Sequence, residues 1–129
     1  FLRTGDIDHW LNSCIEIQVL DTADLDEPHK HSCGAIFDCL APSENAVLPP
    51  GTWNHYTITC RDNMIYVVLN NTQIIEMNLN RWKKAGRNPD GTDNKFKHAL
   101  KNFPRTGRLG LQYHGQPIWY RNVKVKKLD

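Results

Sequence analysis

Polar and aromatic side chains suited to chemistry stand two residues apart in three strand-like segments: Glu16 and Gln18, Gln112 and His114, and Trp119 and Arg121. Because side chains along a strand point alternately to opposite faces, the two members of each pair share a face. A carboxylate and an imidazole are suited to proton transfer, and a guanidinium binds an anionic oxygen or orients a carboxylate. If the three strands present one face of a sheet, the pairs predict an acid–base site.

Each pair also has an ordinary structural explanation. Polar residues that alternate along a strand, as Glu16 and Gln18 do, often only face water. His114 stands before a glycine turn, where a histidine often serves as a hydrogen-bonded turn residue. Trp119 is explained equally well as a core residue, and a pair of Arg121 with a carboxylate as a structural ion pair. The residue types by themselves leave both interpretations open.

Short apolar or alternating segments separated by turn residues fill most of the chain. They predict strands at 14–20, 34–41, 53–60, 64–69, 73–77, 108–113 and 118–127. The connections at 61–63 and 70–71 are typical of hairpins. With almost no helical pattern, the sequence predicts an all-β, antiparallel two-sheet β-sandwich without a helix longer than about three turns.

The alternation also predicts which apolar side chains face the core. The expected core residues are Ile15, Ile17, Val19, Ile58, Val67, Leu69, Leu109 and Leu111. Residues 78–106 break the strand pattern, and so long a connection is uncommon in a compact domain unless it is functional. We expect this segment to lie at one end of the sandwich and to border the binding site.

Composition limits the class of protein. The 129 residues suffice for one domain, 1–129, and a net charge of +2 with scattered Lys and Arg residues argues against nucleic acid. No apolar run approaches the ~20 residues that span a bilayer, so we expect no membrane span.

The four cysteines (Cys14, Cys33, Cys39 and Cys60) lack CxxC spacing, which argues against a zinc ribbon. A local Cys33–Cys39 bridge and buried thiols both remain open. His29 and His31 suggest either a metal site or an exposed loop.

Five segments resemble the bacterial 3-keto-disaccharide hydrolase family in their order and spacing: 15–21, 34–37 with 41–43, 49–54, 68–71 and 110–122. The insert from Asn88 to Phe96 also looks like that family. The most specific is Gln-Tyr-His-Gly-Gln-Pro-Ile-Trp-Tyr-Arg-Asn at 112–122. Two positions depart from the family pattern, Cys14 in place of a usual glycine and Tyr113 in place of a frequent aspartate. The resemblance implies a concanavalin A-like jelly roll with a sugar site on its concave sheet.

The resemblance further implies an enzyme that cleaves 3-keto-glycosides or 3-keto-disaccharides by elimination and hydration. A C3 ketone makes the C2 hydrogen acidic, so the reaction needs a base, an acid and an electrophile for the enolate oxygen. The residues implied as catalytic are Glu16, His114 and Arg121. The residues implied as substrate-binding are Gln18, Gln112, Trp119 and Asp21, with Trp119 stacked on a sugar ring. A divalent metal ion is an alternative electrophile, since carboxylate and imidazole would suit it; its ligands are unknown.

The expected partner is a carbohydrate, and the resemblance implies a secreted or periplasmic protein. The alternative function is a non-catalytic carbohydrate-binding module of a secreted protein; a structural interaction domain is a third. Members of the family carry several strands before the position of Phe1. We therefore expect this chain to be about the C-terminal two-thirds of the complete domain, with an upstream segment or another chain supplying the missing strands.

Overall fold

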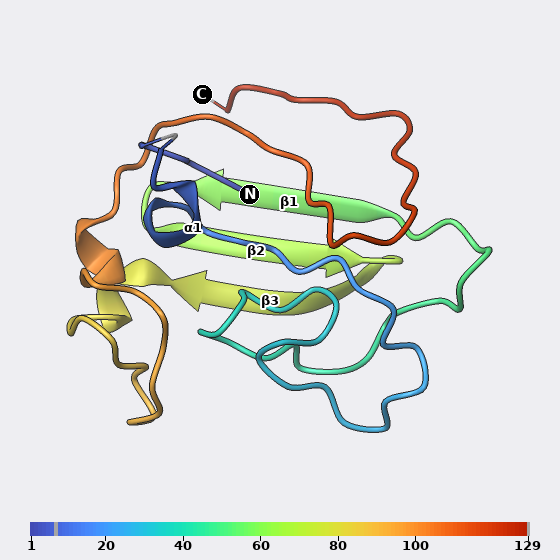
Figure 1. Ribbon diagram of the computed structural model, residues 1–129, viewed down its shortest axis with the longest axis horizontal. Coiled ribbons are helices and arrows are strands. Elements are labelled where there is room, and N and C mark those ends of the chain that lie inside the picture. The colour runs from blue at the N-terminus through green and yellow to red at the C-terminus, as the bar shows by residue number, and fades with distance from the viewer. Residues whose placement is uncertain (7, 129) are drawn as a thin grey trace.

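The computed structural model describes residues 1–6 and 8–128, in which the regular elements are few and short. In chain order they are α1 (Trp10–Ser13), β1 (Tyr56–Arg61), β2 (Met64–Leu69), β3 (Thr72–Asn78) and the single-turn 3₁₀ helices η1 (Leu79–Arg81) and η2 (Leu100–Asn102). The strands form one antiparallel sheet in the order β1-β2-β3 (Figure 1). The described residues are therefore strand-rich with only short helices, as the sequence predicts.

Tight turns join the three strands, and the predicted meander is confirmed with small shifts of its ends. Asp62 has a φ of 49° between β1 and β2, and Asn70 and Asn71 have φ of 51° and 70° between β2 and β3. Aspartate and asparagine tolerate this left-handed region better than most residues. The Asn70 amide also accepts a hydrogen bond from the backbone N–H of His55 at 2.8 Å and donates one to the carbonyl of Ala46 at 2.8 Å. The same asparagine thus shapes the hairpin and ties it to the chain before β1.

Replacing Asn71 by alanine is expected to lower the free energy of unfolding by about 1–2 kcal/mol, because an alanine Cβ is strained at positive φ. Urea unfolding measures this change. An Asn71→Gly variant is the matched control and should keep the stability of the parent, since glycine adopts this φ without strain. Equal stabilities of the alanine and glycine variants would show that the turn conformation is not the cause.

The core lies on one face of this sheet. Along β2 the side chains alternate, and Ile65, Val67 and Leu69 are fully buried. The register between β2 and β3 shifts at Val67/Val68, so that Ile74 has no partner of its own across the ladder. A bulge of this kind turns two successive side chains out of simple alternation, which is why both Ile74 and its neighbour Ile75 are buried.

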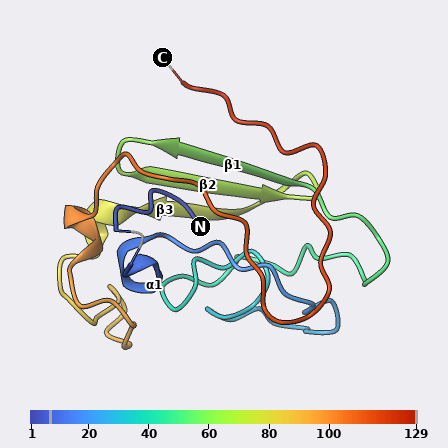
Figure 2. The same ribbon diagram turned by 45° about the horizontal axis from the view of Figure 1, so that its top comes forward.

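Two earlier segments of the chain cover that face of the sheet (Figure 2). Ile15 and Ile17 come from one of them and Ile36 from the other, and all three are buried in the same cluster as the β2 side chains. The two segments meet at the single bridge of Ile17 with Ile36, and backbone hydrogen bonds join residues 16 and 18 of the first to residues 34, 35 and 37 of the second. Leu2 makes a further single bridge to Ile15. The strands predicted at 14–20 and 34–41 are therefore present as bridged segments rather than as strands of a ladder.

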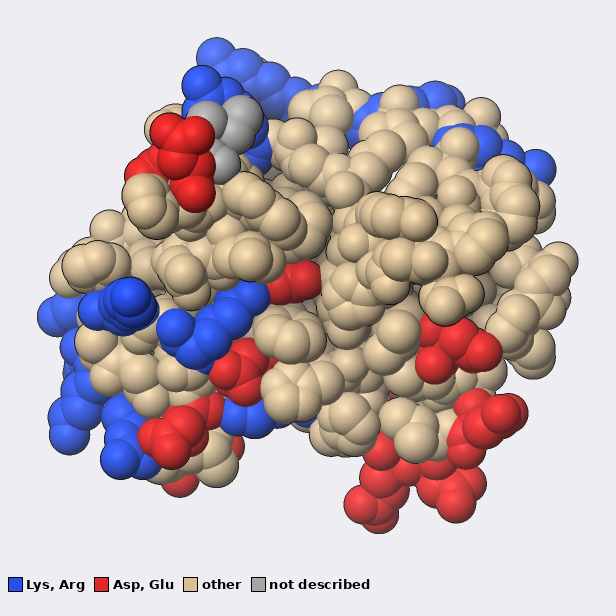
Figure 3. Space-filling model, in the orientation of Figure 1, with Lys and Arg blue, Asp and Glu red and all other residues tan. Residues whose placement is uncertain are grey.

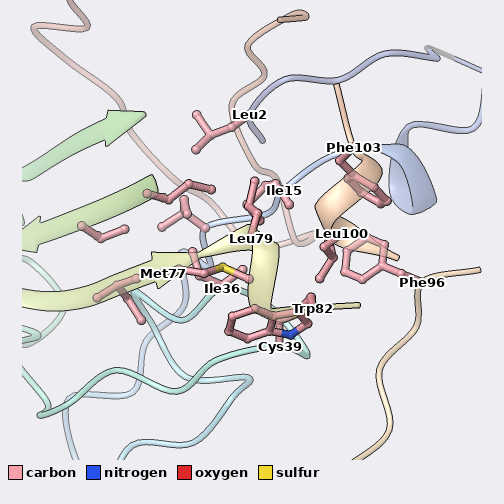
Figure 4. Packing of buried hydrophobic residues seen from close by; sticks show 14 of the residues in the cluster. Leu2, Ile15, Ile36, Cys39, Met77, Leu79, Trp82, Phe96, Leu100 and Phe103 are labelled. Carbon is pink, nitrogen blue, oxygen red and sulfur yellow. The ribbon is translucent and has the colours of Figure 1, made fainter. Parts of the chain in front are cut away.

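The segment 78–106 closes one end of the core (Figure 4). Trp82, Phe96, Leu100 and Phe103 are buried there, and the rings of Phe96 and Phe103 meet edge to face at 5.2 Å. Such aromatic pairs add to the stabilisation that burial of their area provides. The helical turns described in this segment are η1 and η2.

The final part of the chain differs from the sequence prediction. No strand forms over 108–128 in the described part, where Arg108 makes a single bridge to Thr4. Leu109 and Leu111 are 54% and 52% exposed, so their predicted burial is wrong. Gln112, which the alternation placed on the opposite face, is the buried residue instead, because its amide turns inward to make the hydrogen bonds described below.

Of the other six predicted core residues, four are buried and two are not. Ile15, Ile17, Val67 and Leu69 are buried as expected, whereas Val19 is half-buried. Ile58 is 36% exposed, and the prediction that it belongs to the core is wrong. It lies in β1, which is an edge strand with no ladder neighbour on its other side among the described residues. An edge position leaves one side of a strand open to solvent.

All four cysteines are free thiols in this structure, so the Cys33–Cys39 bridge is not formed. Burial raises the pKa of Cys39 to about 12 and also raises the pKa of Cys14. Both therefore remain protonated near neutral pH and behave as small apolar side chains rather than as nucleophiles.

No helix within 1–6 and 8–128 is long and apolar enough to cross a membrane.

Candidate active site

The amide of Gln112 is the centre of a buried polar cluster. Its Nε2 donates to Glu16 Oε1 at 2.6 Å and to Gln18 Oε1 at 2.7 Å, and its Oε1 accepts from the backbone N–H of Val19 at 2.6 Å. Glu16, Gln18 and Gln112 are 4%, 2% and 4% exposed. Because Val19 can only donate, the amide has one orientation that satisfies all three contacts. The structure thus joins two of the three predicted pairs by direct hydrogen bonds.

His114 stands at the exposed side of this cluster. Its Nε2 lies 3.3 Å from Gln112 Nε2, a longer separation than the other contacts of that amide. An amide group has two hydrogens, and the bonds to Glu16 and Gln18 already use both. The imidazole therefore lies beside the cluster on its solvent-exposed side, without a short hydrogen bond to it.

Lys95 completes the cluster, and sequence reasoning missed it. Its Nζ donates to Glu16 Oε2 at 2.8 Å and lies 4.7 Å and 5.4 Å from the ring centres of Phe37 and Phe96. Residues 78–106 therefore reach the Gln112 cluster through Lys95, and the expectation that they border a binding site stays a prediction. Lys95 lies in an irregular segment, so no alternation of side chains along a strand could predict that it faces Glu16. The likeness of the segment from Asn88 to Phe96 to the family was the one available signal.

Tyrosine hydroxyls fix the backbones that carry the cluster. Tyr120 donates to the carbonyl of Gln112 at 2.7 Å, and Tyr56 on β1 donates to the carbonyl of Gln18 at 3.1 Å. Burial raises the pKa of both tyrosines, so each remains a neutral donor near neutral pH. The Tyr56 bond attaches the irregular segment around residue 18 to β1, and the Tyr120 bond attaches the segment around residue 112 to the last part of the chain.

The remaining predicted site residues lie elsewhere. Arg121 stacks with its Cζ 4.0 Å from the centre of the Trp53 ring and, within the described residues, makes no ion pair with Glu16. Trp119 is 74% exposed. Asp21 is exposed in the loop after residue 20, where its Oδ1 accepts from the backbone N–H of Ala23 at 3.4 Å. The structure thus brings Glu16, Gln18, Gln112 and His114 together, and the hydrogen bonds described for this cluster do not include Arg121, Trp119 or Asp21.

The surface around the cluster carries mixed charge. Basic and acidic side chains interleave over the 80–100 segment at the left of Figure 3, whereas acidic side chains gather at the lower right over the loop that follows residue 20. Two hollows of about 270 and 520 Å³ lie on the described surface. Neither is lined by Glu16, Gln112 or His114, so hydrogen bonding and burial, and not the size of a cavity, identify the site.

The side chains present do not suit a divalent metal at Glu16. Both carboxylate oxygens accept from N–H groups, of Gln112 on one side and of Lys95 on the other. Among residues 1–6 and 8–128, no three His, Cys, Asp or Glu side chains gather closely enough to hold a metal ion. His31 pairs instead with Asp38 at 3.0 Å, where Lys30 and His31 lower the pKa of Asp38 against the opposing effect of its burial.

Comparison with known proteins places this arrangement in a family. The family described as the 3-keto-alpha-glucoside-1,2-lyase-like domain matches residues 1–126. A 3-keto-disaccharide hydrolase of Bacteroides thetaiotaomicron is 25% identical over 130 residues, which cover 91% of this chain and 45% of that protein. The crystal structure of a protein of Parabacteroides distasonis, provisionally assigned as a glycosyl hydrolase, superposes with a TM-score of 0.70 at 31% identity.

The superposition covers 78% of this chain and 54% of the Parabacteroides protein. The chain therefore spans about half the length of the relatives that it matches. The family match extends over nearly all of its residues, including every member of the Gln112 cluster. On this evidence the chain belongs to the 3-keto-alpha-glucoside-1,2-lyase-like domain family.

Proposed function

We propose that this chain carries the acid–base site of an enzyme that cleaves 3-keto-glycosides by elimination and hydration. The observation that supports the proposal most is the meeting of Glu16 and His114 at one amide, that of Gln112. A carboxylate and an imidazole so placed are the proton acceptor and donor that the reaction needs. His114 is the exposed member and meets the substrate, while Glu16 lies on the buried side.

The chemistry has two stages in this proposal. The site removes the proton at C2, and the electrons of that C–H bond form an enolate with the C3 ketone. Return of the carbonyl forms a C1–C2 double bond and expels the C1 substituent, which leaves as an alcohol after taking a proton from the site. Water then adds at C1 while a proton returns to C2, so that the overall change is hydrolysis. Only a sugar with the ketone follows this route, because the ketone is what makes the C2 hydrogen acidic.

The fold proposed for the complete domain is a two-sheet sandwich with a concanavalin A-like jelly roll, of which this chain supplies the C-terminal part. Exposed apolar side chains support it, since Leu109, Leu111 and Val125 lie open in segments predicted to be strands. Monomeric proteins rarely leave such surface uncovered. Strands from a preceding segment or from another chain would pair with these segments and bury their side chains.

The direct test is turnover by the full-length protein of a 3-keto-glucoside and of its unoxidised parent, each with and without a chelator. We expect release of the C1 alcohol from the ketone alone, and at the same rate with chelator, because Glu16 is already engaged by Lys95 and Gln112. Cleavage of the unoxidised parent at a similar rate would contradict elimination. Loss of activity with chelator and recovery on adding a divalent ion would assign the electrophile to a metal.

A non-catalytic carbohydrate-binding module is the second candidate function. Exposed aromatic side chains favour it, with Trp53, Tyr113 and Trp119 at 48%, 71% and 74% exposure. Aromatic faces of this kind stack on the apolar faces of sugar rings. Retention of the protein on a polysaccharide, together with no turnover of any 3-keto-glycoside, would favour this candidate over the enzyme.

A further inference from the structure

We propose that Lys95 is a positioning residue that holds the buried carboxylate of Glu16 in one orientation. The inference rests on the proposed acid–base function of Glu16. In this proposal the 78–106 segment places a positively charged side chain at a fixed position beside Glu16. Arg121, the cation that the sequence suggested, stacks on Trp53 instead.

The contact between the two charged groups is close and largely enclosed. Lys95 Nζ lies 2.8 Å from Glu16 Oε2, and the two side chains are 21% and 5% exposed. The rings of Phe37 and Phe96 lie beside the ammonium group and limit its access to water. An ammonium group on an aromatic face is further stabilised by the quadrupole of the ring.

Burial makes the charge of Glu16 dependent on its partner. A carboxylate removed from water favours its neutral, protonated form unless an opposite charge or donated hydrogen bonds stabilise the anion. Gln112 supplies one neutral hydrogen bond, and Lys95 supplies the only formal positive side-chain charge within hydrogen-bond distance of Glu16 in the described part of the chain. Lys95 therefore supplies the charge that compensates the burial of this carboxylate, and its ammonium group fixes the position of Oε2.

Other titratable groups near Glu16 do not replace Lys95. The thiol of Cys14 stays protonated because burial raises its pKa. The amine of Phe1 donates to the carbonyl of Gly110 at 2.9 Å, and burial lowers its pKa. His114 lies beside Gln112 at 3.3 Å and, among the described residues, makes no ion pair with Glu16. Within the described part of the chain, Lys95 is thus the one side chain that combines direct contact with positive charge.

The local fold of the segment fixes where Lys95 points. The backbone N–H of Gly86 donates to the carbonyl of Phe96 at 2.7 Å, and the backbone N–H of Asn94 donates to the carbonyl of Gly86 at 3.0 Å. The side chain of Asn94 accepts from the N–H of Phe96 at 3.0 Å. These bonds close a loop on either side of Lys95, and the buried Phe96 ring anchors it to the core.

The test compares Lys95→Met and Lys95→Arg with the parent in the full-length protein. We expect Lys95→Met to lower kcat on a 3-keto-glucoside about 10-fold at neutral pH with KM nearly unchanged, because the ground-state contacts of the sugar remain. Lys95→Arg keeps the charge and should restore most of kcat. Lys97→Met, at an exposed lysine of the same segment, is the control and should match the parent.

An activity-independent measurement separates this inference from the proposed function. In a crystal structure of Lys95→Met the Glu16 carboxylate should lose the single orientation that it has in the parent, whether or not any substrate is turned over, whereas in Lys95→Arg it should keep that orientation. Should Lys95→Met fail to fold, the Glu16→Gln/Lys95→Met double variant should fold, because it removes both charges together. Parental kcat and a parental orientation of the Glu16 carboxylate in folded Lys95→Met would overturn the proposal, as would failure of Lys95→Arg to restore kcat.

Discussion

Replacing His114 by alanine is expected to lower turnover of a 3-keto-glycoside by at least ~100-fold, which is the usual contribution of a positioned general acid or base. The imidazole is the exposed member of the Gln112 cluster, and both hydrogens of that amide are already donated to Glu16 and Gln18. Removing the ring therefore takes away a proton-transfer group without breaking a short hydrogen bond. Steady-state kinetics with the 3-keto-glucoside measures the effect.

The same substitution should leave the fold unchanged, because an exposed side chain contributes little packing. The thermal midpoint and the circular dichroism spectrum of His114→Ala should equal those of the parent. His98→Ala is the matched control, since His98 is exposed on the 78–106 segment outside the cluster, and it should keep full activity. Parental turnover by a folded His114→Ala protein would remove histidine from the mechanism and favour the carbohydrate-binding module.

Replacing Asn88 by alanine is expected to lower the free energy of unfolding by about 3 kcal/mol, because it leaves several buried polar groups without partners. Asn88 is 5% exposed, and its Oδ1 accepts from Trp82 Nε1 and from Asn94 Nδ2, both at 2.9 Å. Its Nδ2 donates to the carbonyl of Asp38 at 3.0 Å and to Thr92 Oγ1 at 3.1 Å. One side chain thus joins the segment to the core and to the turn that precedes Lys95.

Urea unfolding of Asn88→Ala measures the loss. Asn80→Ala, at an exposed asparagine of η1, is the control and should change the stability by less than about 0.5 kcal/mol. We also expect lower turnover in Asn88→Ala, because Asn94 helps to close the loop that holds Lys95. A stability within about 0.5 kcal/mol of the parent would mean that water replaces the lost amide contacts without cost.

Local patterns predicted the elements whose stability is itself local. The β1–β2–β3 meander follows from alternating apolar residues and from turn residues that accept positive φ, as at Asn70 and Asn71. Residues adjacent in sequence form these hairpins, so the pattern of each strand and the geometry of each turn determine the pairing. The burial of Val67 and Leu69 followed for the same reason.

Alternation failed where long-range hydrogen bonds decide which side chains face inward. The pattern at 108–113 placed Leu109 and Leu111 inside, yet Gln112 is the buried residue because Glu16, Gln18 and Val19 satisfy its amide. A polar side chain can be buried when all its hydrogen-bonding groups find partners, and those partners lie far away in sequence. No local pattern carries that information.

By itself, the sequence determined the strand-rich character of this protein, its three-strand meander and its family, together with the four cluster residues Glu16, Gln18, Gln112 and His114 as candidates for one site. Each of these depends on residue types at short, fixed spacings. Only the tertiary structure decided that Lys95 is the cation beside Glu16 and that Arg121 stacks on Trp53. An irregular segment has no periodicity to orient its side chains, so the position of Lys95 depends on packing and hydrogen bonds that form only when distant parts of the chain meet.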